Sequence, residues 1–360
     1  MLTLVIFLVV ISVLVLVHET GHFVAAKRAG MKVEEFGLGF PPRLASFKRG
    51  GTLYSVNLIP FGGFVRIFGE DGEHRNAPGS FGAGSFVAKV AVVVAGVVMN
   101  FLFAVVLLVL GNFLGLRVGI FDAATEARAL QKEVQVLDVA PLSPAQTAGL
   151  QSLDVITGFK DGGTFTGTAN PEDVQHYAYA HAGSETLIVI QRGGATQDLP
   201  LHLRQPQGPT EGPIGISLAL TGVVRYPWYE ALWRGFASAG VMFWAILVGY
   251  GTILRSLVVS GHAGADISGP VGIATMTGEA ARIGFNYLMQ FVAMISINLA
   301  VLNILPFPAL DGGRLVIVAA EKLRGRALSE RVEQAVNAVG FIILILLMVA
   351  VTIKDIVQYF

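Results

Sequence analysis

The first 26 residues join a long apolar run to a metal-binding motif, and this combination restricts the fold more than any other feature. Leu2 to Val17 contains no charged residue and leads directly into His18-Glu19-Thr20-Gly21-His22. An apolar run of this length predicts a helix that spans a membrane. The two histidines are four residues apart, so a helix places both imidazoles on one face, where they can bind one Zn²⁺ with Glu19 beside them as general base.

Chance is the alternative explanation for so short a motif. An ionisable side chain at the centre of a membrane helix costs roughly 2.5 to 3.5 kcal/mol on insertion scales, so such residues are a functional hypothesis by default. The position of the motif therefore favours a metal site. The apolar run also lacks the basic start of a signal peptide, and we expect it to be a retained membrane helix.

The composition agrees with a membrane protein. Hydrophobic residues make up 53% of the 360 positions and charged residues only 14%, which is too apolar for an ordinary soluble domain. Basic and acidic residues are equal in number, 25 each, so the charge balance does not indicate a nucleic-acid partner. The chain has no cysteine, which excludes disulfides and leaves histidines and carboxylates as metal ligands.

A β-hairpin is expected soon after the first helix. Thr52–Ile59 and Phe64–Phe68 have the residue pattern of strands, and Pro60-Phe61-Gly62-Gly63 between them is typical of a turn. An extended substrate backbone could pair with the edge of such a hairpin. A purely structural connector is the alternative.

The composition changes to that of a soluble domain after the second apolar segment. Residues 117–230 contain 7 basic and 12 acidic residues. Ser143 to Leu150, followed by Leu153 to Ile156, resembles the PDZ signature, in which a helix precedes a Gly-Leu turn and a strand. Further strands are expected at Val134–Val139, Leu187–Gln191 and Leu199–Leu203. About ninety residues fit one PDZ copy.

Charge around the apolar segments predicts the topology. Residues 27–89 hold 9 basic against 5 acidic residues, and a basic cluster follows Asp311, so both regions are expected in the cytoplasm. The first helix then runs inward. Asp311 can meet the histidines only if the helix from Tyr287 also runs inward, and the apolar segment at 231–254 must then be re-entrant or lie on the outer face.

These observations predict a membrane α-helical protein with about four transmembrane helices, a cytoplasmic-side β-hairpin and an inserted extracytoplasmic PDZ-like α+β domain. The second helix carries Gly96 and Asn100 on one face, which predicts a close helix contact with a polar group directed inward, or ordinary packing. The predicted segments are 1–26 (first span), 27–85 (loop and hairpin), 86–116 (second span), 117–226 (PDZ-like domain), 227–285 (outer-face or re-entrant helices), 286–313 (third span), 314–333 (cytoplasmic helix) and 334–360 (fourth span).

Several motifs together resemble the site-2 protease family of intramembrane zinc metalloproteases. They are the His18–His22 motif, the PDZ-like insert, Ser268-Gly269-Pro270, and Asn303 to Gly313 with its Leu-Asp-Gly core. The likeness is greatest to the bacterial sigma-E-regulator protease (RseP-type) branch. The best-known members of that branch carry two tandem PDZ domains, whereas one is expected in this chain.

The resemblance implies a ligand set and a substrate site. Asp311 is implied as the third zinc ligand, which agrees with the three protein ligands and one open position of catalytic zinc; a helix cap is the alternative. Asn298 and Asn303 are implied to hydrogen-bond an unwound substrate, with helix–helix hydrogen bonding as the alternative. The implied substrate contacts also include Pro306, Pro308, Gly62 and Gly63. No catalytic role is expected for His74, His176, His181, His202 and His262.

The implied function is regulated intramembrane proteolysis in the bacterial inner membrane. A zinc endopeptidase of this kind cuts single-span membrane proteins, such as anti-sigma factors and remnant signal peptides, after a site-1 protease has removed their outer domains. A membrane binding module with a PDZ domain and structural zinc is one alternative, and a transporter with a proton relay is another. The PDZ-like domain would either capture a new C-terminus or exclude bulky substrates.

Overall fold

The computed structural model describes residues 2–70, 74–206, 212–261, 268–326 and 328–359, and the chain divides into two compact units. The first unit comprises Met1–Val109, Leu232–Ala281 and Leu288–Phe360. The second comprises Leu110–Ala231 and Arg282–Tyr287.

Five helices of the described chain are long and apolar enough to cross a membrane, by length and composition. This set fits a multi-pass membrane protein. It exceeds the four spans expected because it includes the segment that was expected to be re-entrant or to lie on the surface. The five are α1 (Leu2–Arg28), α2 (Phe86–Leu114), α6 (Trp228–Ser260), α8 (Phe285–Ile304) and α10 (Glu330–Tyr359).

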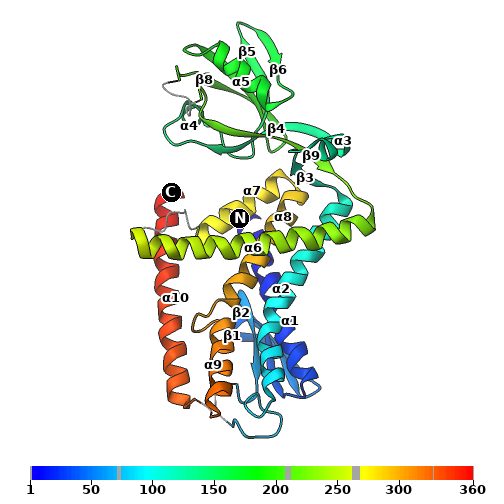
Figure 1. The fold of residues 1–360 in the computed structure, drawn as a ribbon, viewed down its shortest axis with the longest axis vertical. Coiled ribbons are helices and arrows are strands. Elements are labelled where there is room, and N and C mark those ends of the chain that lie inside the picture. The colour runs from blue at the N-terminus through cyan, green and yellow to red at the C-terminus, as the bar shows by residue number, and fades with distance from the viewer. Residues whose placement is uncertain (1, 71–73, 207–211, 262–267, 327, 360) are drawn as a thin grey trace. The chain divides into compact units, whose positions relative to one another are not determined.

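Helix α6 runs across the direction of α10 instead of alongside it (Figure 1). One face of α6 packs against α2 and α8 through residues at helical spacing, among them Ala239, Phe243 and Tyr250. The opposite face exposes apolar side chains such as Trp244 and Val241. Its two-sided apolar character suits contact with lipid, and the expectation that it does not cross the bilayer stays a prediction.

Helices α1 and α2 approach each other closely at Gly21. A Cβ atom on Gly21 would lie 2.3 Å from the carbonyl oxygen of Ala95, so only glycine fits. This contact brings the face of α2 against the histidines of α1.

The predicted hairpin is wrong in its pairing. Residues 52–59 and 64–67 are strand, but both belong to β2 (Thr52–Ile67), which pairs with β1 (Val33–Arg49), a strand that the sequence analysis missed. The reversal lies at Gly50-Gly51, where both residues have positive φ. Residues 35–38 of β1 lie between residues 53–56 and residues 63–66 of β2 and pair with both. The two expected strands therefore do not pair with each other.

The third apolar helix ends earlier than the predicted boundary of residue 313. Helix α8 ends at Ile304, residues 305–310 are non-helical, and α9 (Asp311–Arg324) begins at the expected ligand. Pro306 and Pro308 account for the interruption, since proline donates no backbone hydrogen bond and disfavours helix in the preceding residue.

Helix α7 (Pro270–Ile283) is held at its start by α10. The buried Asp355 carboxylate accepts hydrogen bonds from the backbone N–H groups of Gly269, at 3.1 Å, and Gly272, at 2.7 Å. These donors have no partner within a helix, and a carboxylate there also interacts favourably with the helix dipole. The Ser268-Gly269-Pro270 motif thus begins α7 against α10.

The second unit is an α+β domain around one sheet. Its strands follow the order β3-β9-β4-β5-β7-β8, with β6 paired to β5. The core contains Val136, Phe159, Ile188 and Leu201, all fully buried. The elements are β3 (Leu116–Gly119), α3 (Ala123–Arg128), β4 (Leu130–Val139), α4 (Pro144–Thr147), β5 (Val155–Asp161), β6 (Thr164–Gly167), α5 (Pro171–Ala180), β7 (Glu185–Arg192), β8 (Ala195–His202) and β9 (Ile216–Val224).

Candidate active site

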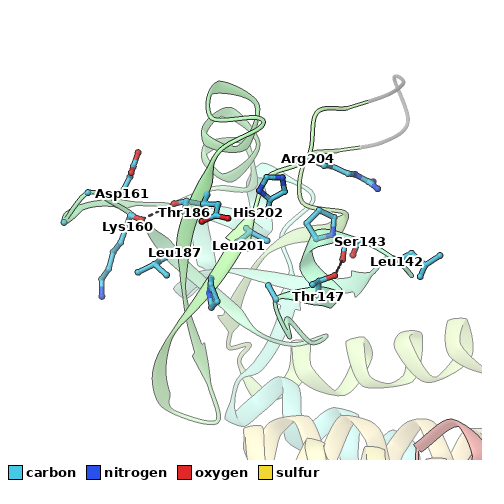
Figure 2. Close-up of a pocket in the computed structure, with 16 residues that line it drawn as sticks. Leu142, Ser143, Thr147, Lys160, Asp161, Thr186, Leu187, Leu201, His202 and Arg204 are labelled. Atoms are coloured by element: carbon cyan, nitrogen blue, oxygen red, sulfur yellow. Dashed lines mark hydrogen bonds between the residues drawn. The ribbon is translucent and has the colours of Figure 1, made fainter.

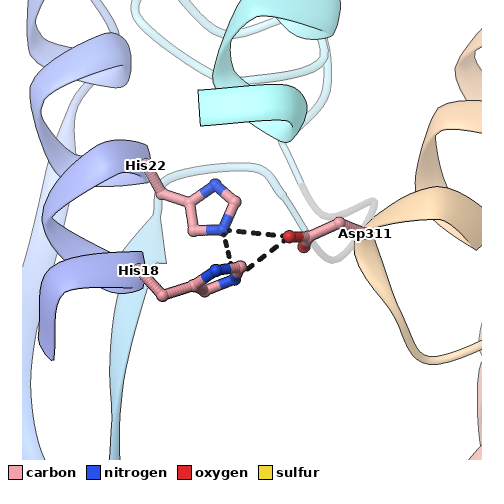
Figure 3. Close-up of side chains that lie close together, drawn as sticks. All are labelled: His18, His22 and Asp311. Carbon is pink, nitrogen blue, oxygen red and sulfur yellow. Dashed lines mark hydrogen bonds and ion pairs between the residues drawn. The ribbon is translucent and has the colours of Figure 1, made fainter. Parts of the chain in front are cut away.

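Three side chains from two distant parts of the chain meet in the first unit (Figure 3). Oδ2 of Asp311 lies 3.1 Å from Nε2 of His18 and 3.3 Å from Nε2 of His22. The two Nε2 atoms are 3.1 Å apart. One turn of α1 separates the histidines, which places both rings on the face directed at α9.

The start of α9 is shaped to bring Asp311 to this point. A Cβ atom on Gly312 would lie 2.1 Å from the carbonyl oxygen of Leu305, and one on Gly313 would lie 2.3 Å from that of Phe307. The two glycines therefore let the non-helical segment fold back against the first turn of α9. The residue before the helix, Leu310, is its N-cap, so Asp311 is not the cap that was considered as an alternative.

The three residues fit a catalytic zinc site. Each offers one ligand atom, and these atoms lie within 4.8 Å of one another. Oδ2 of Asp311 is buried and accepts no hydrogen bond within the described chain. The imidazole nitrogens at 3.1 and 3.3 Å are its neighbours, and a buried carboxylate oxygen that accepts no hydrogen bond is costly unless another group, such as a metal ion, binds it. Two imidazoles and one carboxylate leave the fourth position of a tetrahedral ion open for water.

Helix α2 provides one hydrogen bond and the space that the site needs. Nδ1 of His22 lies 2.8 Å from the carbonyl oxygen of Val92. A carbonyl only accepts, so Nδ1 donates and Nε2 keeps its lone pair for a metal. Gly96 supplies the space, since a Cβ atom there would lie 2.4 Å from Nε2 of His22 and 2.7 Å from Nε2 of His18.

A cavity of about 260 Å³ opens beside these atoms, and Glu19 lines it. The β2 residues Phe64, Val65 and Ile67 form one of its walls. Gly63 is also close, because a Cβ atom on it would lie 3.7 Å from Cγ of Glu19. The cavity is thus bordered by the general-base candidate, the ligand cluster and a strand.

The sequence analysis missed two charged residues of the cavity. Glu70 and Arg314 both line it and form an ion pair with each other. Arg314 also donates to the backbone carbonyl of Glu70 at 3.3 Å. Arg314 follows Asp311 by three residues, so helical spacing could have placed it near the ligand. No sequence signal marks Glu70.

The predicted substrate residues fall in different places. Asn298 of α8 accepts a hydrogen bond from Tyr250 of α6 at 2.8 Å. This contact corresponds to the alternative of a hydrogen bond between helices. Asn303 is half-buried near the end of α8, and Pro306 is exposed. Pro308 packs against Gly340 of α10. Gly62 lies beside Gly63, close to Phe40.

The other histidines are not part of the cluster. His74, His176, His181 and His202 are absent from the metal-binding group found among the described residues. His262 lies outside the described residues.

The second unit contains a larger groove of about 860 Å³ (Figure 2). Ser143 and Thr147 lie on one side of it and Leu201 and His202 of β8 on the other. β8 ends the strand order of the sheet. The groove has no part in the ligand cluster, whose members all lie in the first unit.

Comparisons with known proteins assign the family. The Peptidase family M50 profile matches residues 6–347. The chain is 36% identical to a candidate zinc metalloprotease of Clostridium perfringens, over 97% of each chain. It is 30% identical to the zinc metalloprotease RasP of Oceanobacillus iheyensis, over 100% of each chain. The chain therefore belongs to peptidase family M50, the site-2 proteases, and is a zinc metalloprotease.

Proposed function

We propose that His18, His22 and Asp311 hold the zinc ion and that Glu19 is the general base of an intramembrane endopeptidase. The observation that carries this proposal is that one carboxylate meets two imidazoles that both belong to the apolar helix α1, and that each of the three side chains offers one ligand atom. Three protein ligands in the described chain are the number that a catalytic zinc site uses, whereas a structural site is usually closed by four.

Glu19 is placed to move protons during the reaction. Zinc held by these three ligands would lower the pKa of a coordinated water to about 7 and would polarise a carbonyl. Glu19 lines the same cavity as the ligands and takes a proton from the attacking water. It then passes that proton to the leaving amine, as a general base that becomes a general acid.

The substrate must be extended before it is cut. A carbonyl within a helix is hydrogen-bonded along the chain and is shielded from attack. Residues 63–65 of β2 border the catalytic cavity, and a substrate segment can pair with such a strand by β-augmentation. Gly62 and Gly63 then contact the substrate main chain, while Asn303, near the end of α8, and Pro306, in the non-helical segment before Asp311, contact the substrate from the other direction.

The substrates are single-span membrane proteins, such as anti-sigma factors or remnant signal peptides, already cut by a site-1 protease. The enzyme lies in the bacterial inner membrane, with residues 27–85 and 314–333 in the cytoplasm because both are rich in lysine and arginine. Residues 117–226 form an extracytoplasmic PDZ-like domain. That domain either binds the newly made C-terminus or excludes substrates that keep a bulky outer domain.

Cleavage of a single-span reporter in lipid vesicles tests the proposal. The purified wild-type protein is compared with the Glu19→Gln variant, and bound zinc is measured in both. We expect both proteins to hold about one zinc per chain and only the wild type to cut, because the glutamine removes the base and leaves the ligands. Cleavage by Glu19→Gln at the wild-type rate would contradict the role of Glu19.

A further inference from the structure

We propose that Asn100 of α2 is a positioning residue that directs His18 toward zinc. Its amide oxygen accepts the Nδ1–H of His18, and Nε2 of His18 then keeps its lone pair for the metal. This inference rests on the proposed function, because it assumes that His18 is a zinc ligand.

Asn100 is buried against the ligand cluster. Its exposed fraction is 1%, and its Nδ2 lies 3.3 Å from Nδ1 of His18. Its Oδ1 is buried and accepts no hydrogen bond within the described residues. A buried acceptor without a donor costs about 1 to 3 kcal/mol. One end of the amide therefore faces His18 and the other is unpaired.

Zinc binding decides which end of the amide must face the ring. A neutral imidazole that binds metal through Nε2 carries its proton on Nδ1. An amide NH₂ opposite that proton would place two donors against each other. A half-turn of the terminal amide group exchanges Nδ2 and Oδ1, which are nearly identical in shape. Oδ1 then gains a donor and Nδ1–H gains an acceptor.

His22 shows the same arrangement with a main-chain partner. Its Nδ1 donates to the carbonyl oxygen of Val92. Val92, Gly96 and Asn100 follow one another at four-residue intervals and so lie on one face of α2. This face of α2 supplies a hydrogen-bond acceptor for each histidine, and Gly96 leaves space for both imidazole rings. The four-residue spacing of Gly96 and Asn100 thus serves the two ligands.

Helix packing alone does not account for the Asn100 side chain. The hydrogen bond that joins α2 to α8 here runs from Oγ of Ser296 to the backbone carbonyl of Asn100, at 2.8 Å. A change of the Asn100 side chain leaves this carbonyl in place. A packing role and a positioning role therefore predict different results when the side chain is replaced.

Zinc affinity measured by chelator competition on the full-length protein in detergent separates these roles. We expect Asn100→Leu, which has a similar volume and no acceptor, to bind zinc about 10- to 100-fold more weakly, the usual effect of removing such a partner. Asn100→Asp keeps an acceptor and should stay close to wild type. Asn112→Leu, which changes another buried asparagine of α2, is the matched control and should bind zinc normally.

Two results would overturn the inference. One is wild-type zinc affinity in Asn100→Leu. The other is equal loss in Asn100→Leu and Asn100→Asp when thermal unfolding shows both folded as the wild type, since that would indicate a packing role. If the Asn100→Leu variant does not fold, Asn100→Ala takes its place in this comparison. His22→Ala tests the proposed function separately, because wild-type zinc binding in that variant would contradict the ligand set itself.

Discussion

At the scale of single residues, the site depends on small side chains as much as on its ligands. Gly21 lets α1 and α2 approach, and Gly312 and Gly313 let α9 begin beside the preceding loop. Gly96 bears most directly on the ligands because the atoms nearest to its missing Cβ belong to both histidines. The positions of both histidine ligands therefore depend on the lack of a side chain at Gly96 of α2.

Gly96→Ala should abolish zinc binding. The added methyl group would lie 2.4 Å from Nε2 of His22, so the imidazole must move away from the metal position. Zinc content of the purified variant, measured by atomic absorption, checks this expectation. Gly249→Ala is the matched control, because nothing lies within 4 Å of a Cβ atom at that helical position; it should keep its zinc. A full zinc complement in Gly96→Ala would show that the histidines bind elsewhere.

At the scale of elements, partly buried ion pairs tie the loop after β2 to the last two helices. Arg75 donates to Glu321 of α9 at 2.7 Å and also pairs with Glu333 of α10. Glu321 accepts a further hydrogen bond from the backbone of Leu328 at 2.9 Å. One guanidinium therefore joins three segments, and breaking such a partly buried pair leaves a charge without its partner.

This cluster predicts a pH dependence of stability. Burial raises the pKa of Glu321. The hydrogen bonds from Arg75 and from the backbone of Leu328, together with the charge of Arg75, lower it by more, so the pKa of Glu321 lies below its ordinary value of 4.5. A depressed carboxyl pKa stabilises the fold above the unfolded pKa, and the stabilisation is lost as the pH falls through the folded pKa. The thermal midpoint should therefore drop steeply below about pH 4.5.

Glu321→Gln and Arg75→Gln test the source of that slope. The first removes the titrating carboxyl and the second removes the cation that lowers its pKa. Both variants should be less stable than wild type at neutral pH and should show a flatter decline in acid, by calorimetry or fluorescence. Wild-type slopes in both variants would show that other groups control acid stability.

At the scale of the whole molecule, the apolar helices and the metal ligands could be predicted from the sequence because short local patterns mark them. The His18–His22 spacing and the apolar run around it are contained in one helix. Asp311 was found through a motif, and the structure brings it to the histidines. Strand β1 was missed because Gly37, Gly39, Pro41 and Pro42 are typical of loops, and its pairing with β2 is not marked by a local sequence signal. Glu70 and Asp355 were missed for the same reason.

The topology of α6 is the main prediction at this scale. The chain has no cysteine, so an introduced cysteine is the only thiol in the protein when it is purified after labelling. Val259→Cys, near the end of α6 and 77% exposed, and Tyr229→Cys, near its start, should both react with an impermeant thiol reagent added outside intact cells. Gly162→Cys should react from outside and Gly50→Cys only after permeabilisation. Labelling of Val259→Cys only after permeabilisation would make α6 a full span.

The central claim is that one zinc ion is held by His18, His22 and Asp311. Anomalous diffraction at the zinc edge from crystals of the Glu19→Gln protein tests it most directly. The account predicts one strong peak per chain, within about 2.0 to 2.2 Å of the two Nε2 atoms and a carboxylate oxygen of Asp311. A zinc peak at other residues, with none between these three side chains, would contradict it.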